Sequence, residues 1–386
     1  MNTIKINSDL LEGFIKDDFK GHDPFDYLNS KIFQFLPLKY SKLCKLIFIQ
    51  FGKRSIINLR DILLNQKSRN AKGLALVVLG LIEDYKRTKE DFYLVNAKKL
   101  VDWLLDHSCD KTKWNYNCWG YNFEWQARAF SVPLGTPNMV TTYFVSLAIY
   151  KFGILTNNEN LQEEALSSAY FMKEKLMSKN NENYVFNYVP NYKAFVHNAN
   201  LFGAYWCLLS GTKNGDKDLI DKSISAINFT VKDQKSDGSW AYGHQSHHQW
   251  IDSFHTGYNL EILNEINDVL NNRNYKKAIY SGYKYYLNKF ILNDGRIKYY
   301  NNAIYPLDVH SYSQAIILIK KLDPKNFSLS DKIVNSLIEN MYLIKNKRFR
   351  YQKGKYLSNN INYFRWTQAW AYYSLSLYNN KINEKN

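Results

Sequence analysis

Cysteine is scarce in this sequence of 386 residues, and the four cysteines form no CxxC pair. A thiolate zinc site needs closely grouped cysteines, and a disulfide framework needs a pattern of paired ones. Neither is indicated here. We expect four ordinary thiols in or near the core, at Cys44, Cys109, Cys118 and Cys207.

The N-terminal stretch lacks a long apolar run. Its first twenty residues, MNTIKINSDLLEGFIKDDFK, carry several acids and no uninterrupted apolar segment. A secretory signal or a transmembrane span requires such a segment. The sequence therefore predicts a cytoplasmic protein.

Acidic residues are outnumbered, with 35 Asp and Glu against 51 Lys and Arg, so the net charge is +16. Such a charge attracts polyanions in general, including nucleic acid, anionic lipid and acidic polysaccharide. The basic residues are scattered, and neither zinc-finger spacing nor an RNA-binding aromatic signature is present, so we predict no nucleic-acid partner. The densest basic run, KNKRFRYQKGK at 345–355, is interpreted as a solvated helix end and loop.

Helical apolar spacing is abundant, and it falls into six pairs of segments within one large domain. Residues 1–38 have no such pattern, and we expect an irregular strap or lid there, followed by a helical domain over 39–386. The paired segments are 40–52 with 71–86, 92–107 with 138–152, 160–177 with 196–210, 217–233 with 254–270, 275–291 with 309–322, and 330–345 with 363–378.

The second segments recur at a nearly constant period. From residue 138 they begin at 138, 196, 254, 309 and 363, which gives gaps of 58, 58, 55 and 54 residues. A fixed period is typical of repeat architectures in which each hairpin covers its neighbour. The loops inside each pair are long and aromatic, whereas the return loops are short and polar, so the long loops are expected to gather at one end.

Six such hairpins predict an all-α protein with an (α/α)6 toroid fold, in which the second helices line the inside. Polar or small residues recur near the starts of those helices, where free backbone N–H groups and positive dipole ends favour an anionic ligand. The alternative is an open solenoid that binds another protein. The residues at the helix starts are Thr141, Thr142, Asn198, Asn200, His255, Thr256, His310, Ser311, Arg365 and Thr367.

One stretch, residues 237–263, concentrates titratable and aromatic side chains between two helical patterns. A mixture of this kind is typical of a ligand cleft. From it we predict substrate-binding roles for Trp240, Tyr242, His244, His248 and Trp250.

Three residues are predicted to be catalytic. Glu124 lies among aromatic residues that would desolvate its carboxylate and raise its pKa, as a general acid requires; an ion pair with Arg128 is the alternative. Asp252 and His255 would share one face of a helix start and could act as a base with its orienting partner, although Asp252 could also cap that helix.

Further substrate-binding residues are expected in the other long loops. Arg365 beside Trp366 could hold an anionic group while the indole stacks on a sugar, although plain packing of Trp366 is equally compatible. His244, His247 and His248 match no established zinc spacing, so we predict neither a metal nor a cofactor. The remaining predicted binding residues are Trp119, Tyr121, Trp125, Arg128, Asp308 and His310.

The string KSISAINFTVKDQKSDGSW at 222–240 is similar to the QW repeat of squalene-hopene-type terpene cyclases, through Gln234, Asp237, Gly238 and Trp240. That resemblance implies a related toroid. The acidic DxDD and DDxxD runs of those enzymes are absent, so terpene cyclisation is not expected.

A longer resemblance is carried by GHDPFDYLNS at 21–30, CWGYNFEWQARAF at 118–130 and HQWIDSFHTGYNLE at 248–261. These strings resemble an uncharacterised bacterial family found with surface-polysaccharide biosynthesis proteins. The resemblance implies a toroid that works on a sugar in capsule, O-antigen or exopolysaccharide assembly, in association with the membrane polysaccharide machinery. A dehydratase label carried by some members implies a β/α barrel, which the pattern here excludes.

Our hypothesis is a carbohydrate-active protein that binds and modifies a sugar or a uronate-containing glycan. Histidine, tyrosine and arginine outnumber acids among its candidates, which favours epimerase or lyase chemistry over hydrolysis by two carboxylates. The alternatives are a carbohydrate-binding scaffold without catalysis and an isoprenoid-binding enzyme.

Overall fold

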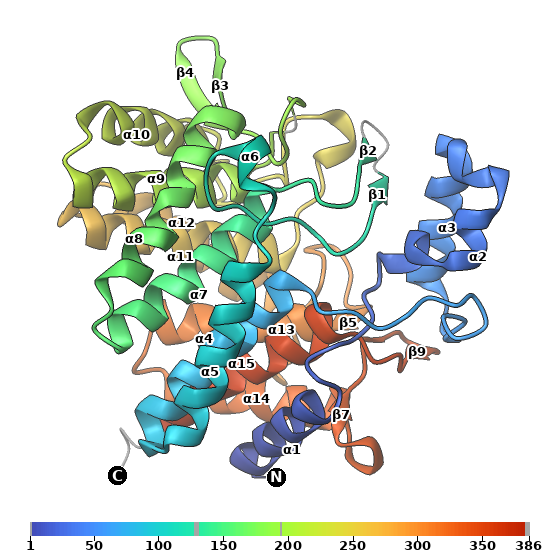
Figure 1. Cartoon of the computed structure of the whole chain (residues 1–386). Coiled ribbons are helices and arrows are strands. Elements are labelled where there is room, and N and C mark those ends of the chain that lie inside the picture. The colour runs from blue at the N-terminus through green and yellow to red at the C-terminus, as the bar shows by residue number, and fades with distance from the viewer. Residues whose placement is uncertain (1, 127–130, 194, 383–386) are drawn as a thin grey trace.

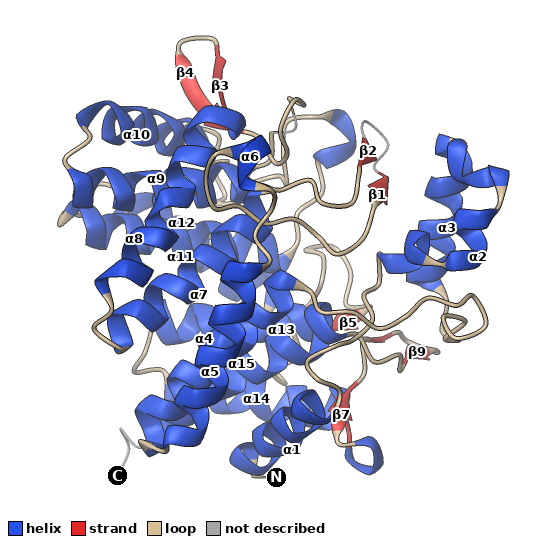
Figure 2. Cartoon of the chain, viewed as in Figure 1, coloured by secondary structure: helices blue, strands red, loops and turns tan. Residues whose placement is uncertain are grey.

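The computed structural model describes residues 2–126, 131–193 and 195–382, and helices dominate them (Figure 1). The strands pair only in small ribbons of two or three, which lie in the connecting loops (Figure 2). The predicted all-α class is therefore confirmed. None of the helices in these ranges combines the length and apolarity needed to span a membrane.

Six helices of the described residues form a closed inner ring. Each packs against the next one in chain order, and the last packs against the first. The open solenoid is therefore wrong. The inner helices are α4 (Ala71–Thr88), α7 (Met139–Leu155), α9 (His197–Asn214), α11 (Ser253–Leu270), α13 (Val309–Leu322) and α15 (Ala369–Ile382).

A second set of helices packs on the outside of this ring. Five of them match the predicted first segments of the hairpins, so the repeat period is confirmed for these pairs. The outer helices are α1 (Thr3–Lys16), α5 (Asp91–Asp106), α8 (Glu159–Phe171), α10 (Lys217–Lys232), α12 (Lys276–Phe290) and α14 (Phe327–Met341).

Helix α1 is a correction, because irregular chain was expected over residues 1–38. Ile6, Leu10 and Phe14 are buried at helical spacing, and Asn2 caps the helix by accepting hydrogen bonds from two backbone N–H groups. Its apolar face packs on α15, so α1 takes the outer position that 40–52 was expected to fill.

Residues 40–52 do form a helix, α3 (Lys42–Arg54), but it belongs to an N-terminal arm, residues 25–64. Figure 1 shows α2 and α3 standing out from the ring. The arm has a small core of its own, made by Leu28, Phe33 and Ile49. The other helices of the arm are η1 (Asp26–Asn29), α2 (Lys31–Phe35) and η2 (Pro37–Tyr40).

Side-chain caps fix where four of the inner helices begin. Asn70, Asn138, Asp252 and Asp308 each accept a hydrogen bond from an N–H in the first turn of the helix that follows. The long loops inside the hairpins lead into these helix starts, so they gather at one end of the ring, as predicted.

The loops contain the short elements. Two of them, η3 and η6, are π-helical turns at the end of α8 and before α15. The short elements are α6 (Lys111–Trp114), η3 (Met172–Leu176), η4 (Ser246–His248), η5 (Ile344–Asn346), η6 (Phe364–Gln368), β1 (Trp125–Gln126), β2 (Ser131–Val132), β3 (Met177–Asn180), β4 (Asn183–Phe186), β5 (Leu307–Asp308), β6 (Tyr342–Leu343), β7 (Arg348–Phe349), β8 (Gln352–Lys353) and β9 (Ser358–Asn359).

The QW-like string joins the end of α10 to α12. The Gln234 amide donates to the carbonyl oxygens of Gly238 and Ala278, both at 2.9 Å, and the buried Trp240 indole donates to the Thr230 carbonyl at 2.9 Å. Gly238 has φ +92°, a conformation that side chains with a Cβ rarely adopt. The residues of this string therefore link two neighbouring hairpins.

Gly238→Ala is expected to lower the free energy of unfolding by about 2–4 kcal/mol, because it combines the positive φ with a Cβ 2.4 Å from the Ser281 carbonyl oxygen. Gly215→Ala is the matched control: its φ is +71°, but its Cβ would meet nothing within 4 Å. Urea unfolding should show the larger loss for Gly238→Ala, and equal losses would contradict the close packing at this turn.

Candidate active site

A cavity of about 140 Å³ opens where the inner helices begin. Each inner helix, or the turn directly before it, contributes to the wall. Helix α11 contributes Phe254, His255 and Tyr258, and the other five contribute Lys72, Val140, Asn198, His310 and Arg365. Aromatic rings from the long loops and the arm form the rest. The remaining lining residues are Phe25, Tyr121, Phe123, Trp125, Tyr188, Tyr242, Phe254, His255, Tyr258 and Trp366.

Arg365 is held at this cavity by Asp23, which lies between α1 and η1. Its Nε and Nη2 atoms donate to the two carboxylate oxygens of Asp23 at 2.6 and 2.8 Å, and both side chains are buried. Burial alone would lower the pKa of Arg365, but the Asp23 carboxylate raises it above its ordinary value. The Nη1 group is not used in this pair, so it can donate to a ligand.

Lys72, in the first turn of α4, places its amine at the buried floor of the cavity. Its Nζ lies 4.4 Å from the centre of the Phe144 ring and 5.3 Å from that of Trp370. Among the described residues, none accepts a hydrogen bond from the Lys72 amine. Burial lowers the pKa of Lys72 well below its ordinary value, and the Arg365 charge lowers it further. An anionic ligand would supply the partner that this amine lacks.

Asp252 and His255 form a dyad at the start of α11. One carboxylate oxygen of Asp252 accepts from the His255 backbone N–H, and the other lies 2.8 Å from His255 Nδ1. Asp252 therefore caps the helix and orients the ring at the same time. If Nδ1 carries the proton, His255 Nε2 has a free lone pair, and the imidazole lines the cavity as a base would.

His310 places a second imidazole on the same cavity. Its ring is stacked between Phe254 and Trp370, with centroids 4.5 Å from each, and its Nε2 lies 2.5 Å from the Tyr258 hydroxyl. Burial lowers the pKa of His310 well below its ordinary value, so the ring is neutral. The His255 and His310 rings each lie about 6 Å from the Tyr258 ring. A proton donor and a proton acceptor therefore line the same part of the cavity.

Asp308 lies one layer behind the cavity. It caps α13, accepts from the Gln352 amide at 2.8 Å and lies 3.4 Å from the Trp366 indole nitrogen. Burial raises the pKa of its carboxyl to about 6. Asp308 therefore positions Trp366.

The raised pKa of Asp308 predicts a pH-dependent stability. A folded-state pKa above the ordinary value of 3.8 favours folding at low pH, and this contribution is lost as the pH rises through about 6. Asp308→Asn keeps the capping oxygen and cannot ionise. Relative to wild type, the variant should gain about 2–3 kcal/mol in the free energy of unfolding between pH 4 and pH 7.5. Guanidinium unfolding across that range measures it, and parallel pH profiles would contradict the buried ionisation.

Known structures share this architecture at low sequence identity. An α-mannanase of glycoside hydrolase family 76 from Bacteroides thetaiotaomicron is 14% identical with a TM-score of 0.60, covering 82% of this chain and 88% of that one. A cellobiose 2-epimerase from Bacillus thermoamylovorans is 13% identical with a TM-score of 0.60, and the coverage of the two chains is the same. An unsaturated glucuronyl hydrolase from Bacillus sp. GL1 is 12% identical with a TM-score of 0.55, covering 79% of this chain and 84% of that one.

The fold is an (α/α)6 toroid. No protein-family model matches the sequence, and no curated protein is similar to it. The toroid is thus established by structure, and the cavity lies at the end of the toroid where the inner helices begin.

Several predicted site residues meet at the mouth of the toroid. Tyr121, Trp125, Tyr242, His255, His310, Arg365 and Trp366 all line the cavity. Trp250 lies behind Tyr242, with the two rings stacked at 4.3 Å, and His248 contacts the edge of the same tyrosine at 5.0 Å. Burial lowers the pKa of His248 to about 4.

Other predicted site residues lie elsewhere in the toroid. Trp119 and Trp240 are buried, and their indole N–H groups donate to backbone carbonyls of Leu104 and Thr230. Glu124 pairs with Lys45 of the arm at 2.5 Å and does not line the cavity; its catalytic role stays a prediction. Arg128 lies outside the described residues.

The three histidines considered as metal ligands do not group together. His244 contacts Asp233 instead, while His247 is exposed and its ring lies beside that of His248 at 4.2 Å. The loop between α10 and α11 points these side chains in different directions.

The sequence analysis missed Lys72, Asp23, Tyr188 and Tyr258. A signal for Lys72 did exist, because it occupies the first turn of an inner helix, where polar residues were noted in the other five hairpins. Tyr188 and Tyr121 share a hydroxyl contact of 2.5 Å across the cavity wall, which no local pattern reveals.

Proposed function

We propose that this protein acts on a sugar in the cavity at the mouth of the toroid, and that the sugar carries an anionic group such as a uronate carboxylate. The observation that carries the proposal is the convergence of Lys72, Arg365 and the starts of the inner helices on one aromatic cavity. Positive helix ends and basic side chains attract an anion, while aromatic rings stack on sugar faces.

The reaction that the geometry supports best is a proton transfer. Two imidazoles and a tyrosine hydroxyl line the cavity, whereas no Asp or Glu does so among the described residues. Hydrolysis by a carboxylate pair needs two such groups beside the scissile bond. In an epimerase or lyase, His255 would remove the proton next to the sugar carboxylate, and Tyr258 with His310 would return a proton or assist the leaving group.

The structural neighbours support a carbohydrate substrate, since their names denote a mannanase, an epimerase and a glucuronyl hydrolase. We place the reaction in surface-polysaccharide assembly on the three strings that resemble that family. Each string contributes to the site: Asp23 and Phe25 from the first, Tyr121 and Trp125 from the second, and His255 from the third. An isoprenoid ligand is not favoured, because an apolar chain in this cavity would leave the buried amine of Lys72 without a partner.

The test is incubation of uronate-containing oligosaccharides with the pure protein in deuterium oxide, followed by mass spectrometry. Proton transfer predicts a gain of one deuterium at the acidic carbon, or an unsaturated product. The matched variant His255→Gln should prevent both changes. Hydrolysis without isotope exchange would refute the proton transfer, and tight binding without any product would support the carbohydrate-binding scaffold instead.

A further inference from the structure

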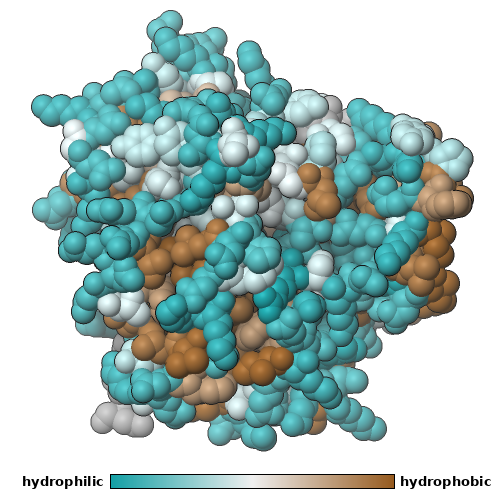
Figure 3. Space-filling model, viewed as in Figure 1, coloured by the Kyte–Doolittle hydropathy of each residue, from teal (hydrophilic) through white to brown (hydrophobic). Residues whose placement is uncertain are grey.

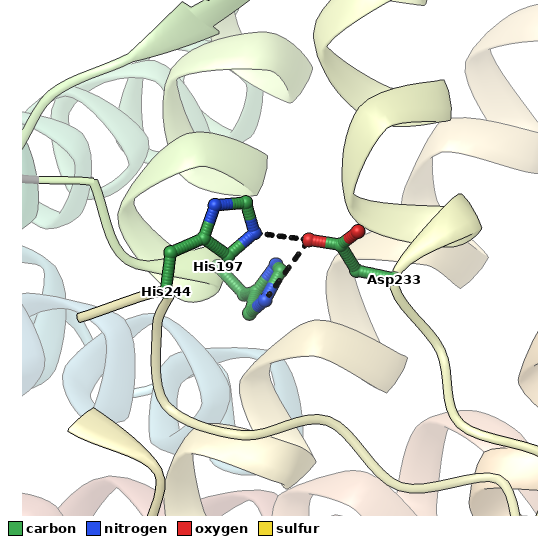
Figure 4. A group of neighbouring side chains, drawn as sticks. All are labelled: His197, Asp233 and His244. Carbon is green, nitrogen blue, oxygen red and sulfur yellow. Dashed lines mark hydrogen bonds and ion pairs between the residues drawn. The ribbon is translucent and has the colours of Figure 1, made fainter. Parts of the chain in front are cut away.

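A second cluster of chemically competent side chains, drawn in Figure 4, lies close in sequence to Asn198 and Tyr242 of the cavity wall. His197 is the first residue of α9, Asp233 follows α10, and His244 lies in the loop between α10 and α11. One ligand atom from each of the three residues lies within 4.8 Å of the others. Both imidazoles face the same carboxylate oxygen of Asp233 (Figure 4).

The spacing suits a shared cation. His197 Nε2 lies 3.7 Å from Asp233 Oδ2, which is too far for a hydrogen bond. Two ligands that each bind zinc at about 2.0–2.2 Å in tetrahedral geometry lie roughly 3.3–3.6 Å apart. The His197–Asp233 distance therefore fits two ligands of one ion, whereas His244 Nε2 is hydrogen-bonded directly to the same oxygen and would move back to admit the ion.

The contacts of His197 orient its ring in the way that suits a metal ligand. Its Nδ1 lies 3.2 Å from the Thr230 hydroxyl, so Nε2 is the nitrogen that faces Asp233. Such a second hydrogen bond orients ligating histidines in metal proteins.

The outer side of the cluster stays open. Phe195 and Phe229 pack against the His244 ring with centroids at 4.6 and 5.3 Å, while the His244 side chain is 42% exposed. Water or another small ligand can therefore reach a fourth position. Two imidazoles and one carboxylate are the donor set of zinc and other first-row divalent metals.

We propose that His197, Asp233 and His244 form a binding site for a divalent transition-metal ion such as Zn²⁺, with water as the fourth ligand. This ion would tie the loop that contains Tyr242 to the helices α9 and α10. The His197 N–H already donates to the Tyr242 carbonyl at 3.1 Å, so the ion would hold the Tyr242 wall of the cavity in place.

The test uses Co²⁺ and Zn²⁺ alone on the chelator-treated, full-length protein. One equivalent of Co²⁺ should produce the absorption bands of a tetrahedral site, and Zn²⁺ should displace it. His244→Ala should weaken binding by at least about 100-fold, because it removes an exposed ligand without disturbing the core. His247→Ala, an exposed histidine of the same loop, is the matched control and should bind like wild type.

Two results would overturn the site. One is the absence of Co²⁺ binding by wild type at micromolar protein and metal. The other is unchanged binding by both His244→Ala and Asp233→Asn, which would place the metal elsewhere. Because the readout is metal binding, the result is independent of the proposed sugar chemistry.

A different observation concerns the N-terminal arm. Its outer surface exposes large apolar side chains, including Phe35 at 90%, Tyr40 at 82% and Leu43 at 66%. Leu43, Ile47 and Phe51 form one exposed stripe at four-residue spacing along α3. Figure 3 shows this apolar surface over the arm at the right of the view. An apolar patch of this kind marks a contact surface.

The charge of the arm indicates what it contacts. The arm, residues 25–64, contains seven Lys and Arg against two acids, Asp26 and Asp61, and Asp26 is paired with Arg60. Of the basic residues, Lys31, Lys42 and Arg54 are exposed beside the apolar stripe. Apolar side chains flanked by cations are the pattern of helices that lie in the surface of anionic membranes.

We infer that the arm docks on an anionic lipid surface. Vesicles that contain phosphatidylglycerol should sediment the protein in a salt-sensitive manner, and pure phosphatidylcholine vesicles should not. Leu43→Ser with Ile47→Ser should reduce binding at least tenfold, and Tyr280→Ser, an exposed aromatic residue on α12, should not. No binding to anionic vesicles, or a dimer in solution that this double variant dissociates, would overturn the inference.

Discussion

His255→Gln is expected to reduce turnover of the proposed sugar substrate by about 10²–10⁴-fold, because the variant loses the imidazole that we propose as the base and that Asp252 holds at 2.8 Å. Substrate affinity should change much less, since the cavity keeps its aromatic walls. Steady-state kinetics that separate kcat from KM measure both effects.

The control for this variant is His247→Gln, which changes an exposed histidine of the preceding loop and should retain full activity. Asp252→Asn should show an intermediate loss, because the amide still caps α11 but no longer presents a carboxylate oxygen to His255 Nδ1. Retention of wild-type kcat by His255→Gln would remove His255 from the catalytic machinery.

Arg365→Met is expected to lower the free energy of unfolding by about 3–5 kcal/mol, because it leaves the Asp23 carboxylate buried without its partner. The pair with Asp23 joins the segment after α1 to the last hairpin, 342 residues further along the chain. Urea unfolding with tryptophan fluorescence measures the loss.

The double variant Asp23→Leu with Arg365→Met provides the decisive comparison. Removing both charges avoids the unpaired carboxylate, so at least half of the lost stability should return. A double variant no more stable than Arg365→Met would contradict the account of this buried pair.

The inner ring was predictable because its signal is local and repeated. The capped starts of α7, α11 and α13 follow Asn138, Asp252 and Asp308, and the period of the hairpins is visible in the sequence. Helical spacing alone could not place α1 and α3, because both are amphipathic and the packing on α15 decides which of them takes the outer position.

The site was predictable where one loop or one helix turn contains both partners. Asp252 with His255 is such a case, since the cap and the dyad are three residues apart. The partners of Arg365 and Glu124 come from distant segments, Asp23 before the arm and Lys45 within it, so only the tertiary structure brings them together. Lys72 looked like an ordinary polar residue of an apolar helix because its burial arises from the neighbouring inner helices.

The most direct test of the central claim is a crystal structure of the protein soaked with a uronate disaccharide. The account predicts a sugar ring against the aromatic wall of the cavity, its carboxylate within hydrogen-bond distance of Lys72 or Arg365, and its acidic carbon facing His255. A disaccharide bound only outside this cavity, or an empty cavity at saturating ligand, would contradict it.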